Sequence, residues 1–246
     1  MNLELVVGIL GLSFGFLGNF VSGLYSLASM SSFLALGIPP HLSLSIYHFG
    51  NIGFSSGGLF RYFRNKNIVW KYVLPMTLLS ITGIIIGTKL VLEINEEVLE
   101  KVMSILILIF IPITLMNRNL GVVKKTVNKT KEWFGYIVYF ITKIWYGFFP
   151  AGGGIYFSYV YLYFFGMTIL DMKGTSRIPG LVGAFSAGIV LMVNGVVNWK
   201  LGLIFLITNF IGSNIGTHYT IKVGNKILQY FLIISILLFA TITLFF

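Results

Sequence analysis

Long apolar stretches, separated by short polar segments, dominate this chain of 246 residues. A helix needs about 20 predominantly apolar residues to cross a bilayer. The stretches that approach or exceed this length are residues 3–37, 41–60, 68–91, 99–116, 133–166, 175–193, 199–219 and 227–246. The pattern therefore predicts an all-α integral membrane protein with about eight hydrophobic segments.

The first and fifth segments are too long for one perpendicular span. A helix of ~35 residues reaches ~52 Å at 1.5 Å per residue, against a hydrocarbon core of about 30 Å. Both segments also contain small residues, in "GNFVSG" and in "PAGGG". Because glycine costs about 1 kcal/mol and proline about 3 kcal/mol in a helix interior, we expect each segment to be a kinked helix or a broken, re-entrant pair of half-helices.

An internal duplication is indicated when the sequence is compared with itself at an offset of 129 residues, which brings Trp199 onto Trp70. The following Lys matches in both copies, and "GIIIGT" (83–88) meets "GSNIGT" (212–217) in the same register. This predicts two homologous four-segment repeats. They cover residues 1–116 and 133–246, with a linker at 117–132. Duplicated halves are typical of secondary transporters.

Basic residues gather in the linker 117–132 and in the loop 61–71, which places both on the cytoplasmic side by the positive-inside rule. The loops 171–177 and 218–226 are also net basic. They reach the same side only if the fifth segment is re-entrant. In that case the repeats are inverted and both termini lie outside; a fully crossing fifth segment would leave the repeats parallel, and both arrangements stay open.

Composition excludes several function classes. The chain is 57% hydrophobic and only 10% charged, where a soluble domain has about a quarter of its residues charged. The net charge of +10 is explained by the loops, so no nucleic-acid partner is expected. The absence of cysteine excludes disulfides and thiol chemistry. No zinc-protease, paired-aspartate or nucleotide-binding motif is present, so we expect neither an enzyme nor a cofactor or metal.

The glycine-rich break and the motif that follows it are the candidate substrate site. A broken helix exposes backbone N–H groups at the start of its second half, where the helix dipole favours an anion. "KGTSRIPG" (173–180) adds hydroxyl donors and a cation, and the repeat relation adds polar residues of segment 41–60. The candidate residues are Gly152, Gly153, Gly154, Thr175, Ser176, Arg177, His48 and Asn51.

Each of these features also has a structural explanation. The glycines of the break, and still more those of the two GxxxGT motifs, can serve close helix packing. The hydroxyls can be a helix N-cap beside a snorkelling arginine, and His48 can be a structural polar group in its span. The acidic residues lie at or near segment ends, so a buried carboxylate relay or cation cage is not supported.

The second half resembles the TauE/SafE (TSUP) sulfite exporter family of membrane permeases, in the stretch "GFFPAGGGIYFSYVYLYFFGMTILDMKGTSRIPG" and onward to "NWKLGLI". The first half, from "GFLGNFVSG" through "RNKNIVWKYVLP", is similar to the first repeat of that family. The resemblance implies transport of small, often sulfur-containing anions. This chain departs from the family pattern at Gly23-Leu24-Tyr25, where a glycine-rich break is common, and at Ile46-Tyr47, which align with Thr175-Ser176.

These observations predict a secondary transporter or facilitator in the cytoplasmic membrane. It would move a small anion, a sulfur oxyanion or sulfonate, without metal or nucleotide, and its partners would be that anion and the bilayer. A non-transporting membrane scaffold or assembly partner is the alternative. A metal-cation permease is a third possibility, against which the shortage of carboxylates and thiols weighs. Substrate identity, transport direction, coupling ion and oligomeric state stay open.

Overall fold

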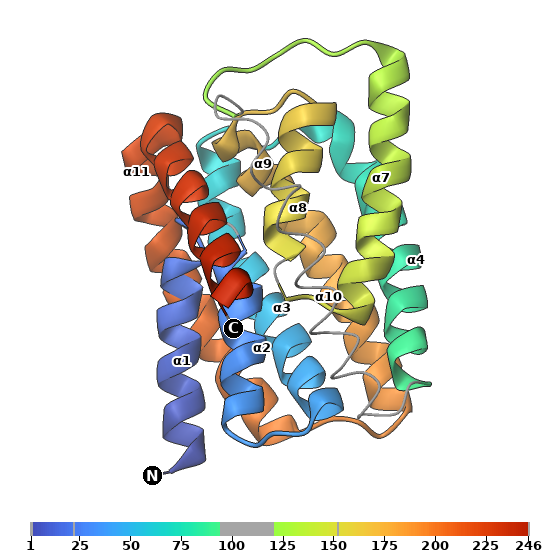
Figure 1. Cartoon of the computed structure of the whole chain (residues 1–246), viewed down its shortest axis with the longest axis vertical. Coiled ribbons are helices and arrows are strands. Elements are labelled where there is room, and N and C mark those ends of the chain that lie inside the picture. Colours follow the sequence, from blue (N-terminus) through green and yellow to red (C-terminus); the bar gives the residue numbers. More distant parts are fainter. Residues whose placement is uncertain (1, 22, 94–120, 152, 246) are drawn as a thin grey trace.

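The computed structural model describes residues 2–21, 23–93, 121–151 and 153–245, and these residues form helices joined by short connections (Figure 1). The helices are α1 (Leu3–Leu17), α2 (Leu24–Ala35), α3 (Pro40–Arg64), α4 (Trp70–Leu92), α7 (Lys129–Phe148), α8 (Gly153–Tyr159), the π-helix η1 (Val160–Phe164), α9 (Ile169–Thr175), α10 (Arg177–Val193) and α11 (Trp199–Phe245). The predicted all-helical class is confirmed. The segment predicted at 99–116 lies outside the described residues.

Two helical stretches of the described chain, Trp70–Leu92 and Ile169–Val193, have the length and apolar composition needed to cross a bilayer. The apolar helices α1 and α2 are shorter. α11 changes direction at Gly224, whose φ of 75° and ψ of 174° are not helical. The kink divides that helix close to the predicted loop 218–226.

Both of the overlong segments are interrupted. α1 ends at Leu17, and α2 begins after Gly23, whose φ of 86° lies in the left-handed region that favours glycine. In the fifth segment α7 ends at Phe148 and α8 begins at Gly153. The structure thus has two half-helices at each place, which is one of the two forms that the sequence predicted.

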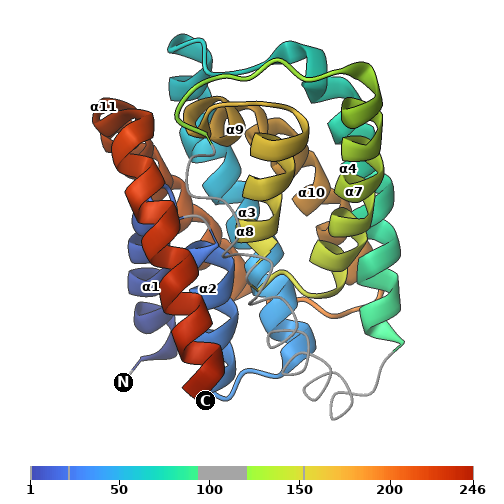
Figure 2. The same cartoon turned by 45° about the horizontal axis from the view of Figure 1, so that its top comes forward.

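The long helices form the frame of the molecule. α3 packs against both α10 and α11, α4 packs against α10 and α7, and α1 packs along α11. α1 and α7 run in opposite directions, and the short elements α2, α8 and α9 lie within this frame (Figures 1 and 2). Phe33, Tyr47 and Phe205 are fully buried in its core.

Glycines permit the closest of these helix contacts. A Cβ added at Gly87 would lie 1.9 Å from the carbonyl oxygen of Ile144 in α7, and one at Gly216 would lie 2.5 Å from that of Phe16 in α1. Gly83 and Gly212 make equivalent close approaches. The packing role expected for the GxxxGT glycines is therefore confirmed.

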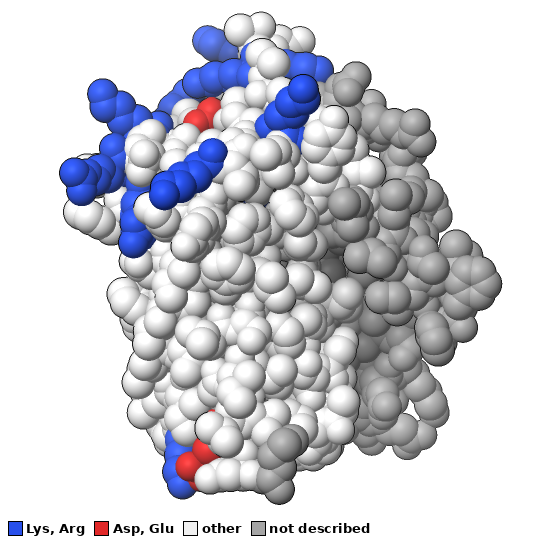
Figure 3. Space-filling model, turned by 90° about the vertical axis from the view of Figure 1, so that its left-hand side faces the viewer, with Lys and Arg blue, Asp and Glu red and all other residues white. Residues whose placement is uncertain are grey.

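Ion pairs also connect α4 with α7 and α11 with α1, the helices that these glycines bring together. Lys71 Nζ lies 2.6 Å from Glu132 Oε1 where α4 and α7 begin, and Lys200 Nζ lies 2.5 Å from Glu4 Oε1 where α11 and α1 begin. Apart from such pairs, charge is unevenly distributed. On the face shown in Figure 3, Lys and Arg side chains gather at one end of the molecule, while the middle is almost free of charge.

Candidate functional site

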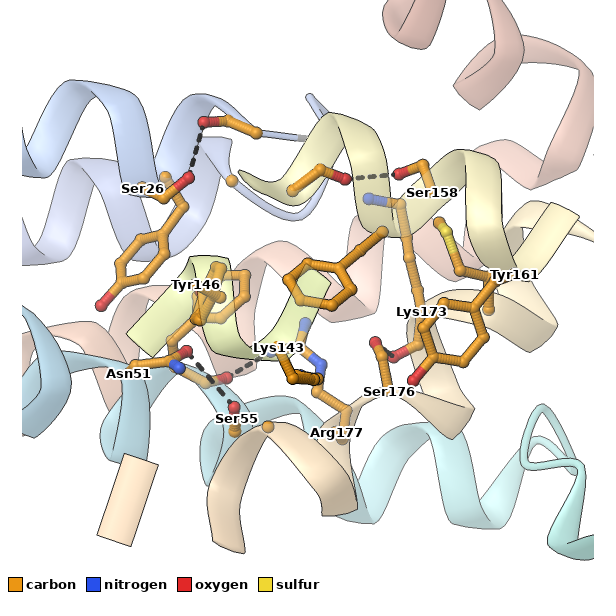
Figure 4. Close-up of a pocket in the computed structure, with 18 residues that line it drawn as sticks. Ser26, Asn51, Ser55, Lys143, Tyr146, Ser158, Tyr161, Lys173, Ser176 and Arg177 are labelled. Atoms are coloured by element: carbon orange, nitrogen blue, oxygen red, sulfur yellow. Dashed lines mark hydrogen bonds between the residues drawn. The ribbon is translucent and has the colours of Figure 1, made fainter. Parts of the chain in front are cut away.

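A cavity of about 130 Å³ lies between the two helix breaks. Gly23 of the first break and Gly154 of the second both line it. Figure 4 shows the side chains that reach it from α2, α3, α7, α8, η1, α9 and α10. The polar and charged lining residues are Tyr25, Ser26, Asn51, Ser55, Lys143, Tyr146, Ser158, Tyr161, Lys173, Ser176 and Arg177.

The cavity is cationic. Lys143, Lys173 and Arg177 are only 5%, 8% and 4% exposed, and all three line it. No Asp or Glu is among the lining residues in the described parts of the chain. Buried charges in proteins are normally paired. Three buried cations without a carboxylate therefore favour an anion in this cavity.

Lys143 projects from α7 into a group of aromatic rings. Its Nζ lies 4.2 Å from the ring centroid of Phe157, 5.2 Å from that of Tyr139 and 5.4 Å from that of Tyr146. Ring faces stabilise a cation, but they do not neutralise it or consume its N–H donors. Lys143 is therefore held in place with its N–H donors available to a ligand.

Arg177, the first residue of α10, is held by neutral acceptors. Its Nη1 donates to the carbonyl oxygen of Phe54 and, at 3.3 Å, to Ser213 Oγ, while Nη2 donates to Asn19 Oδ1. Its guanidinium carbon also lies 4.2 Å from the centroid of the Phe54 ring. These contacts fix the side chain without cancelling its charge, and they tie α10 to the first helix break.

Asn19 organises the first break. The side chain is 1% exposed, its Nδ2 donates to Gly15 O at 2.7 Å, and its Oδ1 also accepts from Thr217 Oγ1 at 2.9 Å. Arg177 and Thr217 therefore share one acceptor, the side-chain oxygen of Asn19, which lies in the turn between α1 and α2. The break is thus held by polar contacts to α10 and α11.

Hydroxyl and amide groups complete the lining. Ser55 Oγ donates to Asn51 Oδ1 at 3.5 Å, which leaves the amide NH₂ of Asn51 as a donor. Ser176 Oγ donates to Lys173 O at 3.1 Å, and Ser158 Oγ donates to Gly154 O at 2.8 Å. These serines stabilise their own helices and can reorient toward a ligand, because a hydroxyl rotates freely.

The cavity brings together Gly154, Ser176, Arg177 and Asn51 of the predicted site residues. The roles assigned to them from the sequence stay predictions. Gly152 lies outside the described residues.

Three other predicted residues do not line this cavity. Thr175 is fully buried, and its Oγ1 accepts a hydrogen bond of 2.9 Å from the backbone N–H of Val69 at the start of α4. His48 is fully buried on α3 beside the ring of Tyr47. Gly153 faces Tyr146, whose ring would lie 2.6 Å from an added Cβ. A role for these residues in substrate binding stays a prediction without a contact to the cavity.

Lys143, Lys173 and Asn19 were not predicted. Lys143 could have been found, because it lies in the middle of the apolar segment 133–166, and an ionisable residue inside a membrane segment is a functional candidate. Lys173 belongs to the same motif as Thr175. Asn19 carried no comparable signal, since its importance comes from contacts with α10 and α11.

A helical protein with a basic cavity between two broken helices has the features of a membrane transporter. The family model of the sulfite exporter TauE/SafE matches residues 7–243, and the chain belongs to this family. The resemblance noted in the sequence is thereby confirmed, and the protein is a membrane transporter and not an enzyme.

Two relatives agree with this assignment. The chain is 25% identical over 233 residues to a probable membrane transporter protein, ORF9, of Sinorhizobium, covering 91% of this chain and 88% of that one. It is 19% identical over 218 residues to a probable membrane transporter protein of Haemophilus influenzae, covering 87% and 86% of the two chains. No solved structure matches the chain.

Proposed function

We propose that this protein is a secondary transporter or facilitator that carries a small anion, a sulfur oxyanion or sulfonate, across the cytoplasmic membrane. The observation that carries the proposal is the central cavity with Lys143, Lys173 and Arg177 in its lining and no carboxylate among the described lining residues. The family description, sulfite exporter, supports the choice of substrate class.

Electrostatics explain why an anion would be held there. Two opposite unit charges 4 Å apart attract by roughly 4 kcal/mol at an effective dielectric constant of about 20. The anion also offsets the desolvation cost of three buried cations. An oxyanion has several acceptor oxygens, which suits the donors of Lys143, Lys173 and Asn51.

The size of the cavity favours a small substrate. Its volume of about 130 Å³ corresponds to roughly four water molecules at about 30 Å³ each. A compact oxyanion such as sulfite fits this space. The lining side chains are mostly buried, so a bound anion would be largely removed from water.

Equivalent positions in the two halves support an inverted duplication of residues 1–116 and 133–246 about the linker 117–132. Gly37 and Gly166 have φ values of 74° and 64°. Asn65 and Asn194 each donate from Nδ2 at 2.8 Å to the carbonyl oxygen four residues earlier. The opposite directions of α1 and α7 (Figure 1) favour inverted over parallel repeats.

The charge distribution supports a multi-pass arrangement with the basic end in the cytoplasm. The residues 61–71 around the α3–α4 connection, the described linker residues 121–132 and the residues 218–226 around the kink of α11 contribute Lys and Arg there, as the positive-inside rule expects. Since α1 starts at the opposite end (Figure 1), the N-terminus would face outward.

Flux into proteoliposomes tests the proposal. Sulfite, thiosulfate, a small sulfonate, sulfate and chloride are offered in parallel to the wild type, to Lys143→Met and to Lys89→Met, a control that removes an exposed lysine of α4. Saturable flux of one oxyanion is expected, with a raised KM in Lys143→Met and an unchanged KM in Lys89→Met. If folded wild-type protein moves none of these anions, the proposal fails, and a non-transporting membrane scaffold becomes the better explanation.

A further inference from the structure

A second basic pocket opens on the surface between α3 and α11, apart from the central cavity. Its volume is about 450 Å³, and its lining residues are Phe60, Arg61, Arg64, Asn65 and Asn214. None of them lines the central cavity. The described lining carries two arginines and no acidic residue.

Arg61 is held in one orientation in this pocket. Its Nε and Nη2 donate to Asn214 Oδ1 at 3.3 Å and 2.9 Å, and its Nη1 donates to His218 Nδ1 at 3.2 Å. Asn214 is itself fixed, because its Nδ2 donates to the carbonyl oxygen of Gly57 at 3.0 Å. All these acceptors are neutral, so the guanidinium keeps its charge and its planar geometry suits phosphate.

The surroundings of the pocket match the boundary between lipid tails and headgroups. Arg61 and Arg64 stand in the last turn of α3, at the basic end of the molecule (Figures 1 and 3). Phe60 is 68% exposed beside them, and Phe210 of α11 is 44% exposed. In a membrane protein these apolar side chains contact acyl chains, while the arginines contact headgroups.

The opposite end of the molecule provides an internal comparison. At the offset of 129 residues, Arg61 and Arg64 correspond to Val190 and Val193 of α10, and Asn214 corresponds to Ile85 of α4. α10 packs on α4 as α3 packs on α11. Aliphatic residues thus suffice at the equivalent helix contact, and helix packing alone does not require the polar set.

We propose that this pocket binds the phosphate headgroup of an anionic phospholipid in the cytoplasmic leaflet, with the acyl chains along α3 and α11. That leaflet carries a negative surface potential, and basic pockets between helices on its side suit phosphate headgroups. The inference rests on the proposed function only for the assignment of the basic end to the cytoplasm.

Native mass spectrometry of the full-length protein in neutral detergent tests it by titration with phosphatidylglycerol, with phosphatidylcholine, or with inorganic phosphate. Arg61→Gln/Arg64→Gln removes the two cations, and the control Lys124→Gln/Lys125→Gln removes equal charge from exposed linker residues. Asn214→Ile copies the residue at the equivalent position and changes no charge. Phosphatidylglycerol is expected to bind at least five-fold more weakly to both pocket variants and unchanged to the linker control.

If phosphatidylglycerol binding were weakened equally in both double variants and unchanged in Asn214→Ile, the proposal would be overturned. Such a result would indicate diffuse attraction of the lipid to the basic surface. Inorganic phosphate that competes fully with the lipid would indicate a free-anion site instead. If the arginine variant does not fold, Asn214→Ile decides the question alone. The titration needs no flux, so headgroup binding by a protein that transports no anion would refute the proposed function and leave this inference standing.

Discussion

Lys143→Met separates a substrate-binding cation from a structural one. The side chain is 5% exposed and its described neighbours are the faces of three aromatic rings and no carboxylate. Methionine has a similar length and no charge, so the substitution preserves the packing and removes the cation. A substrate-binding cation predicts weaker substrate binding and an equal or higher stability in the variant. A structural cation predicts unchanged substrate binding and a lower stability.

The magnitude follows from the contacts. A hydrogen bond to a charged group is worth about 1.5–3 kcal/mol, and each 1.4 kcal/mol is a factor of about ten. Loss of Lys143 should therefore weaken substrate binding roughly 10- to 100-fold. Stability should stay equal or rise, because a buried cation without a counter-ion is replaced by an apolar side chain.

Two assays measure these effects. The KM for flux in proteoliposomes reports substrate binding, and thermal unfolding in detergent without substrate reports stability. Lys143→Arg, which keeps the charge, should recover part of the flux, and Lys89→Met should behave as the wild type. An unchanged KM together with a lower unfolding midpoint in Lys143→Met would refute the reasoning and assign Lys143 a purely structural role.

Other substitutions follow from single contacts. Arg177→Gln should abolish flux and also lower stability by about 1–3 kcal/mol, because the hydrogen bonds from the charged guanidinium to Asn19 Oδ1 and to the carbonyl oxygen of Phe54 are lost; unchanged thermal unfolding would contradict this. Thr175→Val should cost about 1 kcal/mol of stability by leaving the N–H of Val69 without its acceptor, and it should leave the KM unchanged; a raised KM would instead support a role in binding. Gly87→Leu should prevent folding, because its Cβ would meet the backbone of Ile144. Gly153→Leu should fold, but with a displaced Tyr146 ring and reduced flux. Expression of folded Gly87→Leu protein, or wild-type flux in Gly153→Leu, would contradict these expectations. Burial raises the pKa of Glu132, but hydrogen bonds from Lys71 and Tyr72 outweigh it and leave the pKa below its usual value. The pair with Lys71 thus stabilises the protein at neutral pH by at most about 1 kcal/mol and loses this contribution as the pH falls through the carboxyl pKa; Glu132→Gln should flatten that acid-side dependence of the unfolding midpoint.

Local chemistry made much of the fold predictable. Trp70 and Trp199 begin helices as the repeated pattern suggested, and the small residues around Gly23 and Gly153 mark the two breaks because glycine and proline disfavour a helix interior. The GxxxGT motifs identified helix contacts because only glycine lets two backbones approach so closely.

The residues of the candidate site were harder to predict from the sequence, because tertiary contacts determine which side chains line the cavity. Thr175 has a suitable hydroxyl, but the N–H of Val69, distant in sequence, takes it. His48 aligns with Arg177 at the offset of 129 residues, yet only Arg177 lines the cavity. Lys143 was detectable in principle from its place in an apolar segment, because an ionisable residue there is a functional candidate.

The ion pairs at the two ends have a consequence for how the chain could be divided. Lys71 of the first half is paired with Glu132 beyond the linker, and Lys200 of the second half is paired with Glu4. The glycine contacts of Gly87 and Gly216 join the same helices, α4 to α7 and α11 to α1. The helices α4 and α11 therefore each pack against the first helix of the other half, α7 and α1, as in a domain-swapped dimer fused into one polypeptide. Two fragments separated within residues 117–128 should each lack a helix partner alone and should assemble into one protein only when they are produced together.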